Sequence, residues 1–194
     1  MKAPLLALAL ASASAASAST IILTNPTGGN NAGQASTRGF AFNTSIAFTV
    51  THLAFYDFGG DGLGASHEVG LWDPSGNLHV SAVVGSGTSA PLSEDGLWRM
   101  VDIEDFVIPA ASGYVVAASF TQGSDVQFNN APGTINGITY VGGRVINNDT
   151  SVLTYPTSTF SAGFGGGGLA VAVPEPSAAL LAVAGLLGLI RRRR

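Results

Sequence analysis

The chain contains no cysteine in its 194 residues. Without cysteine there is no disulfide framework, so the fold must be held together by its hydrophobic core, alone or with a metal ion. The same absence excludes a cysteine nucleophile, thiolate metal ligands and a lipid anchor on an N-terminal cysteine. Any nucleophile or metal ligand must therefore be an oxygen or nitrogen group.

Basic residues are scarce, and half of them occupy the last four positions. The lone lysine is Lys2, and the arginines are Arg38, Arg99, Arg144, Arg191, Arg192, Arg193 and Arg194. Residues 19–173 therefore contain eleven acidic and three basic side chains, a formal charge of −8, against −4 for the whole chain. This balance argues against nucleic acid and anionic lipid as partners, and it is compatible with cations and neutral glycans.

Helical periodicity is also missing between the two ends of the chain. Apolar residues alternate with period 2 instead, which is typical of half-buried strands. The alternating segments are 40–42, 46–55, 69–71, 78–82, 97–103, 114–118, 138–141 and 144–146. Many short strands with turn signals between them predict an all-β fold, a single β-sandwich or jelly-roll-like domain over residues 19–162.

Two turns are predicted inside this domain, and a linker after it. Asp73, Pro74 and Gly76 stand at the first, second and fourth positions of a type I turn, which should join the strands on either side. The pair Gly142-Gly143 fits a tight hairpin turn between 138–141 and 144–146. The glycines at 163 and 165–168 predict a flexible linker over residues 163–173.

The N-terminus has the three parts of a secretory signal peptide. Lys2 gives a short positive region, residues 5–11 form an apolar core, and Ala16, Ser17 and Ala18 form an A-x-A cleavage site. We expect a signal peptide over residues 1–18 that is cut after Ala18, with residues 13–15 as a weaker alternative site.

The C-terminal segment Pro174–Arg194 also has three parts. Pro174-Glu175-Pro176 is a rigid polar break, residues 177–190 carry no charge, and four arginines follow. Fourteen uncharged residues are short for a permanent span, which needs about 20, although arginine side chains can snorkel and lengthen the segment. We expect a single transmembrane helix with Arg191, Arg192, Arg193 and Arg194 on the cytoplasmic side.

Pro174, Glu175 and Pro176, followed by a short hydrophobic helix and a terminal arginine cluster, resemble the PEP-CTERM sorting signal over residues 174–194. Proteins with this signal occur in Gram-negative bacteria, many of which make extracellular polysaccharide. The resemblance implies that a transpeptidase-like membrane protease, an exosortase, recognises the motif and cleaves near it. The precursor would be held transiently in the inner membrane, and the product would reach the cell surface or be secreted.

A second resemblance covers roughly residues 40–120. The strings LAFYD at 53–57, GGDGL at 59–63 and SHEVGLWD at 66–73, with Trp98-Arg99 and GYVV at 113–116 further on, look like DUF4082-type domains. These are bacterial extracellular β-sandwich domains without an assigned activity. The resemblance therefore implies a fold and no chemistry.

The acidic, glycine-rich stretch 57–73 is the leading candidate for a binding site. Asp57, Asp61, Glu68 and Asp73 offer hard oxygen ligands, and the glycines let carbonyl groups turn inward, as calcium requires. The spacing matches no EF-hand, and the alternative is that these acids cap turns in a solvated loop. The three histidines lack the spacing of a zinc site and are expected at strand edges or at the surface: His52, His67 and His79.

Two further sets of side chains have a functional and a structural interpretation. Trp72 and Trp98 are candidates for stacking on a glycan, and the alternative is that both fill the core. Asp102 and Glu104 would share one face of a strand and form the carboxylate pair of a polysaccharide hydrolase, or simply a solvated face. No G-x-S-x-G nucleophile motif is present.

These observations favour a non-enzymatic, structural or adhesive protein of an exopolysaccharide matrix or biofilm, without a cofactor. A carbohydrate-binding module, with or without calcium, is the alternative, and a polysaccharide hydrolase is a more distant one. The expected partners are an exosortase, the inner membrane before processing and extracellular polysaccharide, but not nucleic acid.

Overall fold

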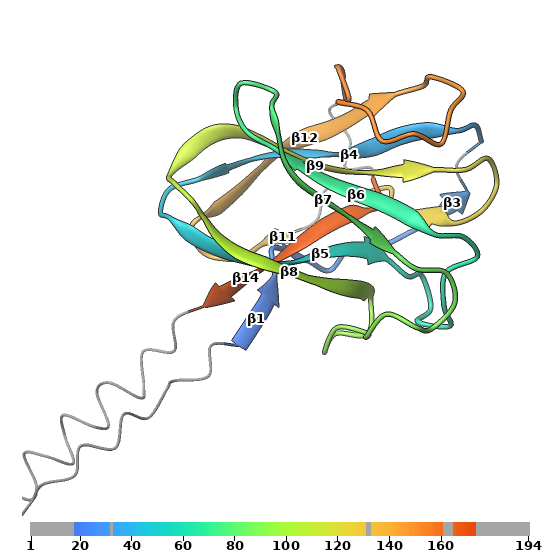
Figure 1. Cartoon of the computed structure of the whole chain (residues 1–194), viewed down its shortest axis with the longest axis horizontal. Helices are drawn as coiled ribbons and strands as arrows, with labels where there is room; N and C mark the ends of the chain where they lie inside the picture. Colours follow the sequence, from blue (N-terminus) through green and yellow to red (C-terminus); the bar gives the residue numbers. More distant parts are fainter. Residues whose placement is uncertain (1–17, 32, 131–132, 161–164, 174–194) are drawn as a thin grey trace, which may run out of the picture. The chain divides into compact units, whose positions relative to one another are not determined.

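The computed structural model describes residues 18–31, 33–130, 133–160 and 165–173. Among these residues the protein is all-β, with two principal antiparallel sheets and no helix (Figure 1). The prediction of an all-β fold is confirmed, and the two layers are those of a β-sandwich. Residues Ser19–Val173 belong to one unit.

Each layer is one of the two principal sheets. The four-stranded sheet has the order β1 (Ala18–Ile21), β14 (Gly167–Val173), β5 (Phe48–Tyr56) and β8 (Trp98–Ile108). The six-stranded sheet has the order β13 (Ser158–Phe160), β12 (Ile138–Ile146), β4 (Ser36–Thr44), β9 (Ala111–Phe120), β6 (His67–Trp72) and β7 (Leu78–Val84). Two small ribbons pair β10 (Val126–Gln127) with β3 (Asn30–Asn31), and β11 (Gly133–Thr134) with β2 (Leu23–Thr24).

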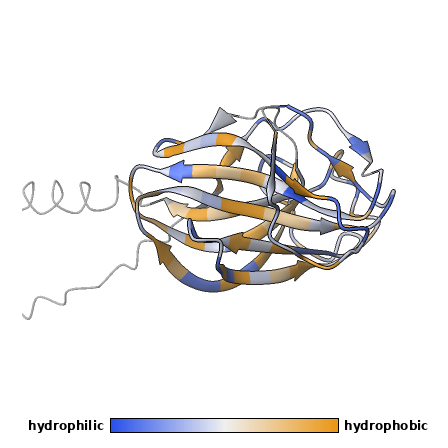
Figure 2. Ribbon diagram, turned by 90° about the horizontal axis from the view of Figure 1, so that it is seen from above, coloured by the Kyte–Doolittle hydropathy of each residue, from blue (hydrophilic) through white to orange (hydrophobic). Residues whose placement is uncertain are grey.

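The core lies between the two sheets because alternate residues of each strand turn inward. Figure 2 shows the hydrophobic residues along the strands of both layers. Phe55 of β5 meets Phe120 of β9 with ring centroids 5.2 Å apart. Phe40 and Phe42 of β4 are also fully buried there. A smaller cluster includes Ala41, whose position between them places it on the other face of the sheet.

The predicted type I turn is confirmed, whereas the predicted glycine hairpin is wrong. The backbone N–H of Gly76 donates to the carbonyl of Asp73 at 2.9 Å, and the turn joins β6 to β7. Gly142 and Gly143 instead lie inside β12, which pairs with β4 from Ile138 to Ile146. They follow a register shift after Tyr140, so a bulge in a continuous strand takes the place of a turn.

The predicted linker over residues 163–173 is also wrong from Gly167 onward, where the chain forms β14. This strand lies between β1 and β5, and Leu169, Ala170 and Val171 are fully buried. The glycines are needed for close packing. A Cβ atom on Gly167 would lie 2.7 Å from the carbonyl carbon of Ala117 in β9. The domain therefore extends to Val173.

We expect Gly167→Ala to lower the free energy of unfolding by about 1–3 kcal/mol, the usual cost of overpacking a close contact. In a flexible linker the same change would be neutral or slightly stabilising. Gly33→Ala is the matched control, because a Cβ atom there meets nothing within 4 Å. Urea unfolding followed by tryptophan fluorescence measures both variants, and equal stabilities would contradict the packing role of Gly167.

Candidate functional site

Asp57, the first predicted calcium ligand, is engaged in a buried ion pair. Its Oδ2 accepts a hydrogen bond from Nε of Arg99 at 2.7 Å, and both side chains are buried. The carboxylate also accepts from the backbone N–H of Gly62. Arg99 donates further to the carbonyls of Gly60 at 2.8 Å and Ala90 at 3.1 Å. The pair thus connects the loops that contain Gly60 and Ala90 to the end of β5 and the start of β8.

Glu68 and Asp73 have separate local partners. Glu68 of β6 accepts a hydrogen bond from Ser81 Oγ of β7 at 2.8 Å. Asp73 accepts from the side chain and the backbone N–H of Asn77 and from the backbone N–H of Ser75. These hydrogen bonds hold the pKa of Asp73 below its usual value, and the one from the Asn77 side chain has the largest effect. Asp73 is therefore a turn residue.

The predicted calcium site at Asp57, Asp61, Glu68 and Asp73 is consequently wrong. In the residues that the structure describes, no three His, Asp or Glu side chains are grouped so that they could hold a metal ion. Asp57 and Asp73 instead stabilise the loop and turn in which they lie, which agrees with the alternative interpretation. Calcium would need six to eight oxygen ligands at one point.

The tryptophans are also structural, so the predicted glycan platform is wrong. Trp98 is fully buried and packs edge-on against Tyr56 and Phe128. Trp72 is 4% exposed and packs edge-on against Tyr155, with ring centroids 5.9 Å apart. Neither ring offers a free face to a sugar. Both tryptophans are buried, as expected of core residues.

His67 is a buried residue, although the sequence predicted a surface or edge position. Its ring stacks on Phe55 with centroids 3.7 Å apart. Nδ1 lies 2.7 Å from the carbonyl oxygen of Ser119, and Nε2 lies 2.8 Å from Oδ2 of Asp125. Both ring nitrogens of His67 therefore face oxygen atoms at hydrogen-bond distance. Only the fold reveals this pair, since 58 positions separate its members.

Asp125 connects His67 to the loop before β6. Burial opposes its ionisation, but hydrogen bonds from His67 and from the backbone N–H groups of Gly64 and Ala65 outweigh burial. The pKa of Asp125 is therefore held below its usual value. The His67–Asp125 pair and the Asp57–Arg99 pair together hold the loops at one end of the sandwich.

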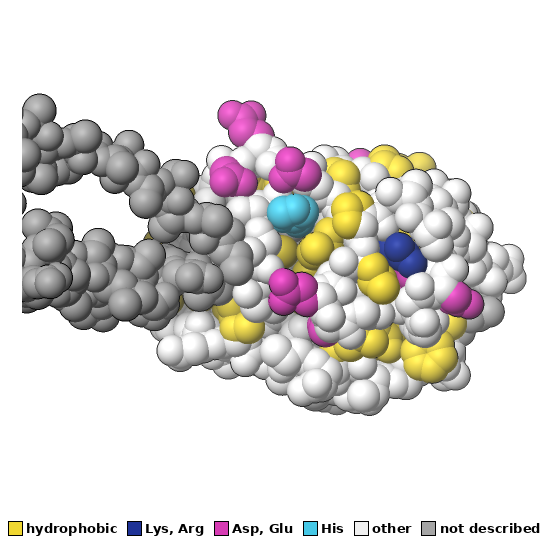
Figure 3. All heavy atoms as spheres, turned by 90° about the horizontal axis from the view of Figure 1, so that it is seen from below, with side chains coloured by type: hydrophobic (Ala, Val, Ile, Leu, Met, Phe, Trp, Pro, Cys, Tyr) yellow, Lys and Arg dark blue, Asp and Glu magenta, His cyan; other side chains and the backbone are white. Residues whose placement is uncertain are grey.

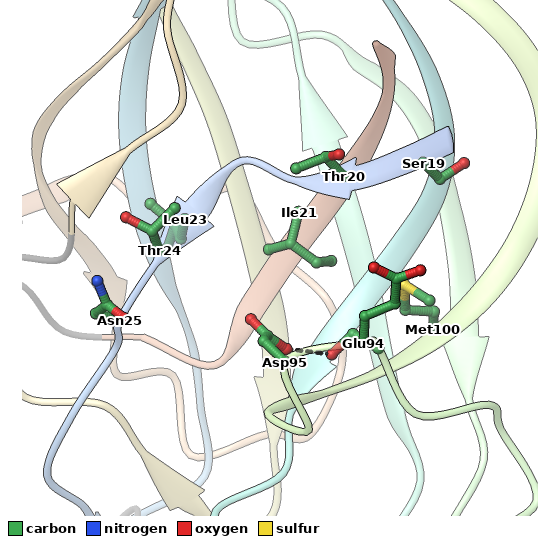
Figure 4. Close-up of a pocket in the computed structure, with 10 residues that line it drawn as sticks. Ser19, Thr20, Ile21, Leu23, Thr24, Asn25, Glu94, Asp95 and Met100 are labelled. Atoms are coloured by element: carbon green, nitrogen blue, oxygen red, sulfur yellow. Dashed lines mark hydrogen bonds between the residues drawn. The ribbon is translucent and has the colours of Figure 1, made fainter. Parts of the chain in front are cut away.

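A cavity of about 450 Å³ lies between the first strand and the turn before β8 (Figure 4). Ser19 and Thr20 line one side of it, and Glu94 and Asp95 line the other. Asp95 is held in place by hydrogen bonds from Ser93 Oγ and from a backbone N–H group. Ile21, Leu23 and Met100 also line it, so hydroxyl, carboxylate and apolar groups all face this cavity.

A chain of polar groups lies beside this cavity. Thr51, at a bulge in β5, has its Oγ1 atom 2.9 Å from both Ser19 Oγ and His52 Nδ1. His52 Nε2 is 3.9 Å from Oδ1 of Asp102, which is beyond hydrogen-bond distance. The Asp102 side chain is 86% exposed, and Glu104 is exposed as well. A hydrolase role for these two carboxylates remains a prediction.

The predicted sorting signal lies outside the described residues, as does the predicted helix over 177–190. Its residues are Pro174, Glu175, Pro176, Arg191, Arg192, Arg193 and Arg194. Nearly all of the predicted signal peptide lies outside them too. Within the described residues there is no helix with the length and apolar character needed to cross a membrane.

Comparisons with known proteins return no match. The chain matches no protein-family model, no curated protein and no solved structure. The resemblances to PEP-CTERM and DUF4082-type proteins therefore remain predictions from the motifs themselves.

We expect Asp57→Ala to lower the free energy of unfolding by about 3–5 kcal/mol, because it leaves the Arg99 guanidinium buried without its carboxylate. Replacing both partners, as Asp57→Leu with Arg99→Met, should cost less than the single change. Asp102→Ala is the control, since an exposed charge contributes less than about 1 kcal/mol. Urea unfolding measures all three, and an Asp57→Ala value near that of Asp102→Ala would contradict this role.

Stability should depend on Asp125 at acid pH. A carboxyl group whose pKa is lower in the folded than in the unfolded state stabilises the fold above the unfolded value, about 3.9. That stabilisation is lost as the pH falls from there toward the lower, folded value. Thermal unfolding between pH 7 and pH 2 should therefore show a steeper acid loss in the wild type than in Asp125→Ala. Parallel profiles for the two proteins would contradict the pairing of Asp125.

Proposed function

We propose that this chain is the precursor of an exported cell-surface or matrix protein, processed by an exosortase-type protease at Pro174-Glu175-Pro176, with a structural or adhesive role. One observation carries the proposal. The unit Ser19–Val173 begins directly after the predicted signal-peptide cut at Ala18 and ends directly before Pro174. Removal of both ends would leave every described strand except the first residue of β1.

The position of β14 supports cleavage at the motif rather than upstream of it. β14 is paired on both sides, so a cut before Val173 would remove residues from an interior strand. β1, the first strand after the predicted signal peptide, is its neighbour, and Ile22 N–H donates to the Leu169 carbonyl at 3.1 Å. The start of β1 and the end of β14 lie side by side (Figure 1). Both predicted processing points thus adjoin one pair of strands.

The charge distribution supports a role outside the cell in a hydrated matrix. Arg38 and Arg99, two of the three arginines in residues 19–173, are buried. Because Asp57 is buried together with Arg99, only the burial of Arg38 makes the surface slightly more acidic than the composition implies. One face carries several acidic side chains around a histidine (Figure 3). Such a surface favours solubility and disfavours nucleic acid and anionic lipid as partners.

The alternative role, a carbohydrate-binding module, has less support because Trp72 and Trp98 are buried. A glycan would have to use the cavity beside Glu94 and Asp95 instead. The structural or adhesive role therefore remains the leading proposal.

Replacing Pro174, Glu175 and Pro176 by alanine should abolish processing and leave a precursor in the membrane fraction. The motif is the proposed recognition element, and the folded unit ends before it. Fractionation of host cells and immunoblotting against the domain would separate the precursor from the shorter product.

Ser177→Ala, one residue beyond the motif, is the matched control and should be processed normally. Equal processing of the wild type and of the triple-alanine variant would refute the proposed sorting mechanism. Absence of processing in the wild type, in a host with an exosortase, would refute it as well.

A further inference from the structure

Among the described residues, four strands lie at the edges of the two principal sheets, and three of them are protected. Natural proteins avoid edge-to-edge pairing with short edge strands, charges or covering segments. β13 has three residues and β1 has four. β8 carries Asp102, Glu104 and Asp105. Its first half is also covered, because Met100 N–H donates to the carbonyl of Pro91 at 2.9 Å.

The fourth edge strand, β7, has none of these protections. It is seven residues long, with the sequence LHVSAVV, which contains no proline and no Asp, Glu, Lys or Arg. It pairs only with β6. Leu78 and Val83 are 50% and 58% exposed. A long, uncharged and exposed edge is a template for another strand.

The two ends of β7 have different neighbours in the other sheet. At its start, His79 lies near Phe106 of β8, with ring centroids 6.0 Å apart. At its end, Val83 lines a cavity of about 360 Å³ together with His52 and Met100. A strand added to β7 at Val80–Val84 would lie over this cavity and bury part of its apolar lining.

We propose that β7 is an association surface for a second copy of this chain, whose own β7 pairs with it in antiparallel orientation. A two-fold axis near Ser81 and Ala82 would make the edge self-complementary, because neither of the two paired strands would carry Asp, Glu, Lys or Arg. The two six-stranded sheets would then form one continuous sheet. This inference does not depend on the proposed processing.

Charge favours a copy of the chain over a basic partner. A basic partner would be attracted to the acidic edge of β8, at Asp102, Glu104 and Asp105, rather than to the uncharged β7. Residues 19–173 carry a formal charge of −8, so two copies repel each other at long range while the paired edges do not. Association should therefore strengthen as salt is raised, because salt screens the repulsion.

The absence of native cysteine makes this surface simple to test in the full chain. Ser81→Cys would place one thiol near the proposed axis, and a short bismaleimide should then give a product of twice the monomer mass. Val152→Cys is the control, because Val152 is 65% exposed but lies outside β7. Denaturing electrophoresis of chains treated in intact cells, and of detergent extracts at low and high salt, would measure the yield.

A second pair of variants tests the edge itself. In the Ser81→Cys chain, adding Val83→Lys should reduce the dimer severalfold, because a lysine on an edge strand opposes pairing. Val141→Lys, at a 54% exposed site on β12, should not. Equal yields from Ser81→Cys and Val152→Cys would overturn the proposal. So would an unchanged yield with Val83→Lys, or a cross-linked product that contains a different protein.

Discussion

The close approach of β14 to β9 is the constraint on which the rest of the structure depends. Without side chains at Gly167 and Gly168, β14 fits beside the carbonyl carbon of Ala117 and the ring of Trp98. In that position it joins β1 to β5 and completes the four-stranded sheet. Leu169, Ala170 and Val171, which precede the predicted sorting motif, are therefore part of the core, and the limits of the folded unit coincide with the predicted processing points.

Buried charges explain why the acidic loops are not a metal site. Asp57 is neutralised by Arg99, and Asp125 accepts from His67. Each pair connects a loop to a strand that is distant in the sequence, and each uses oxygen atoms that a cation would otherwise need. The remaining acids, such as those on β8, lie at the surface, where they oppose edge pairing and increase solubility.

Local patterns predicted the features that depend on local physics. Alternation predicted strands such as β5 and β9, and the type I turn at Asp73 was identified from residues that favour it. Glycine was the residue most often misinterpreted. At 142–143 and 167–168 it looked like a turn and a linker, but in both places it lies within a strand. A glycine can mark flexibility or close packing, and only its neighbours distinguish the two.

The sequence by itself determined the fold class, the one confirmed turn and the acidic balance of the domain, because these follow from residue order and composition. It also contains both predicted targeting signals. Only the tertiary structure decided which side chains meet. It buried Trp72 and Trp98, paired His67 with Asp125, separated the four expected calcium ligands and left β7 as an uncharged edge. These outcomes arise from contacts between strands far apart in the chain, which no local pattern encodes.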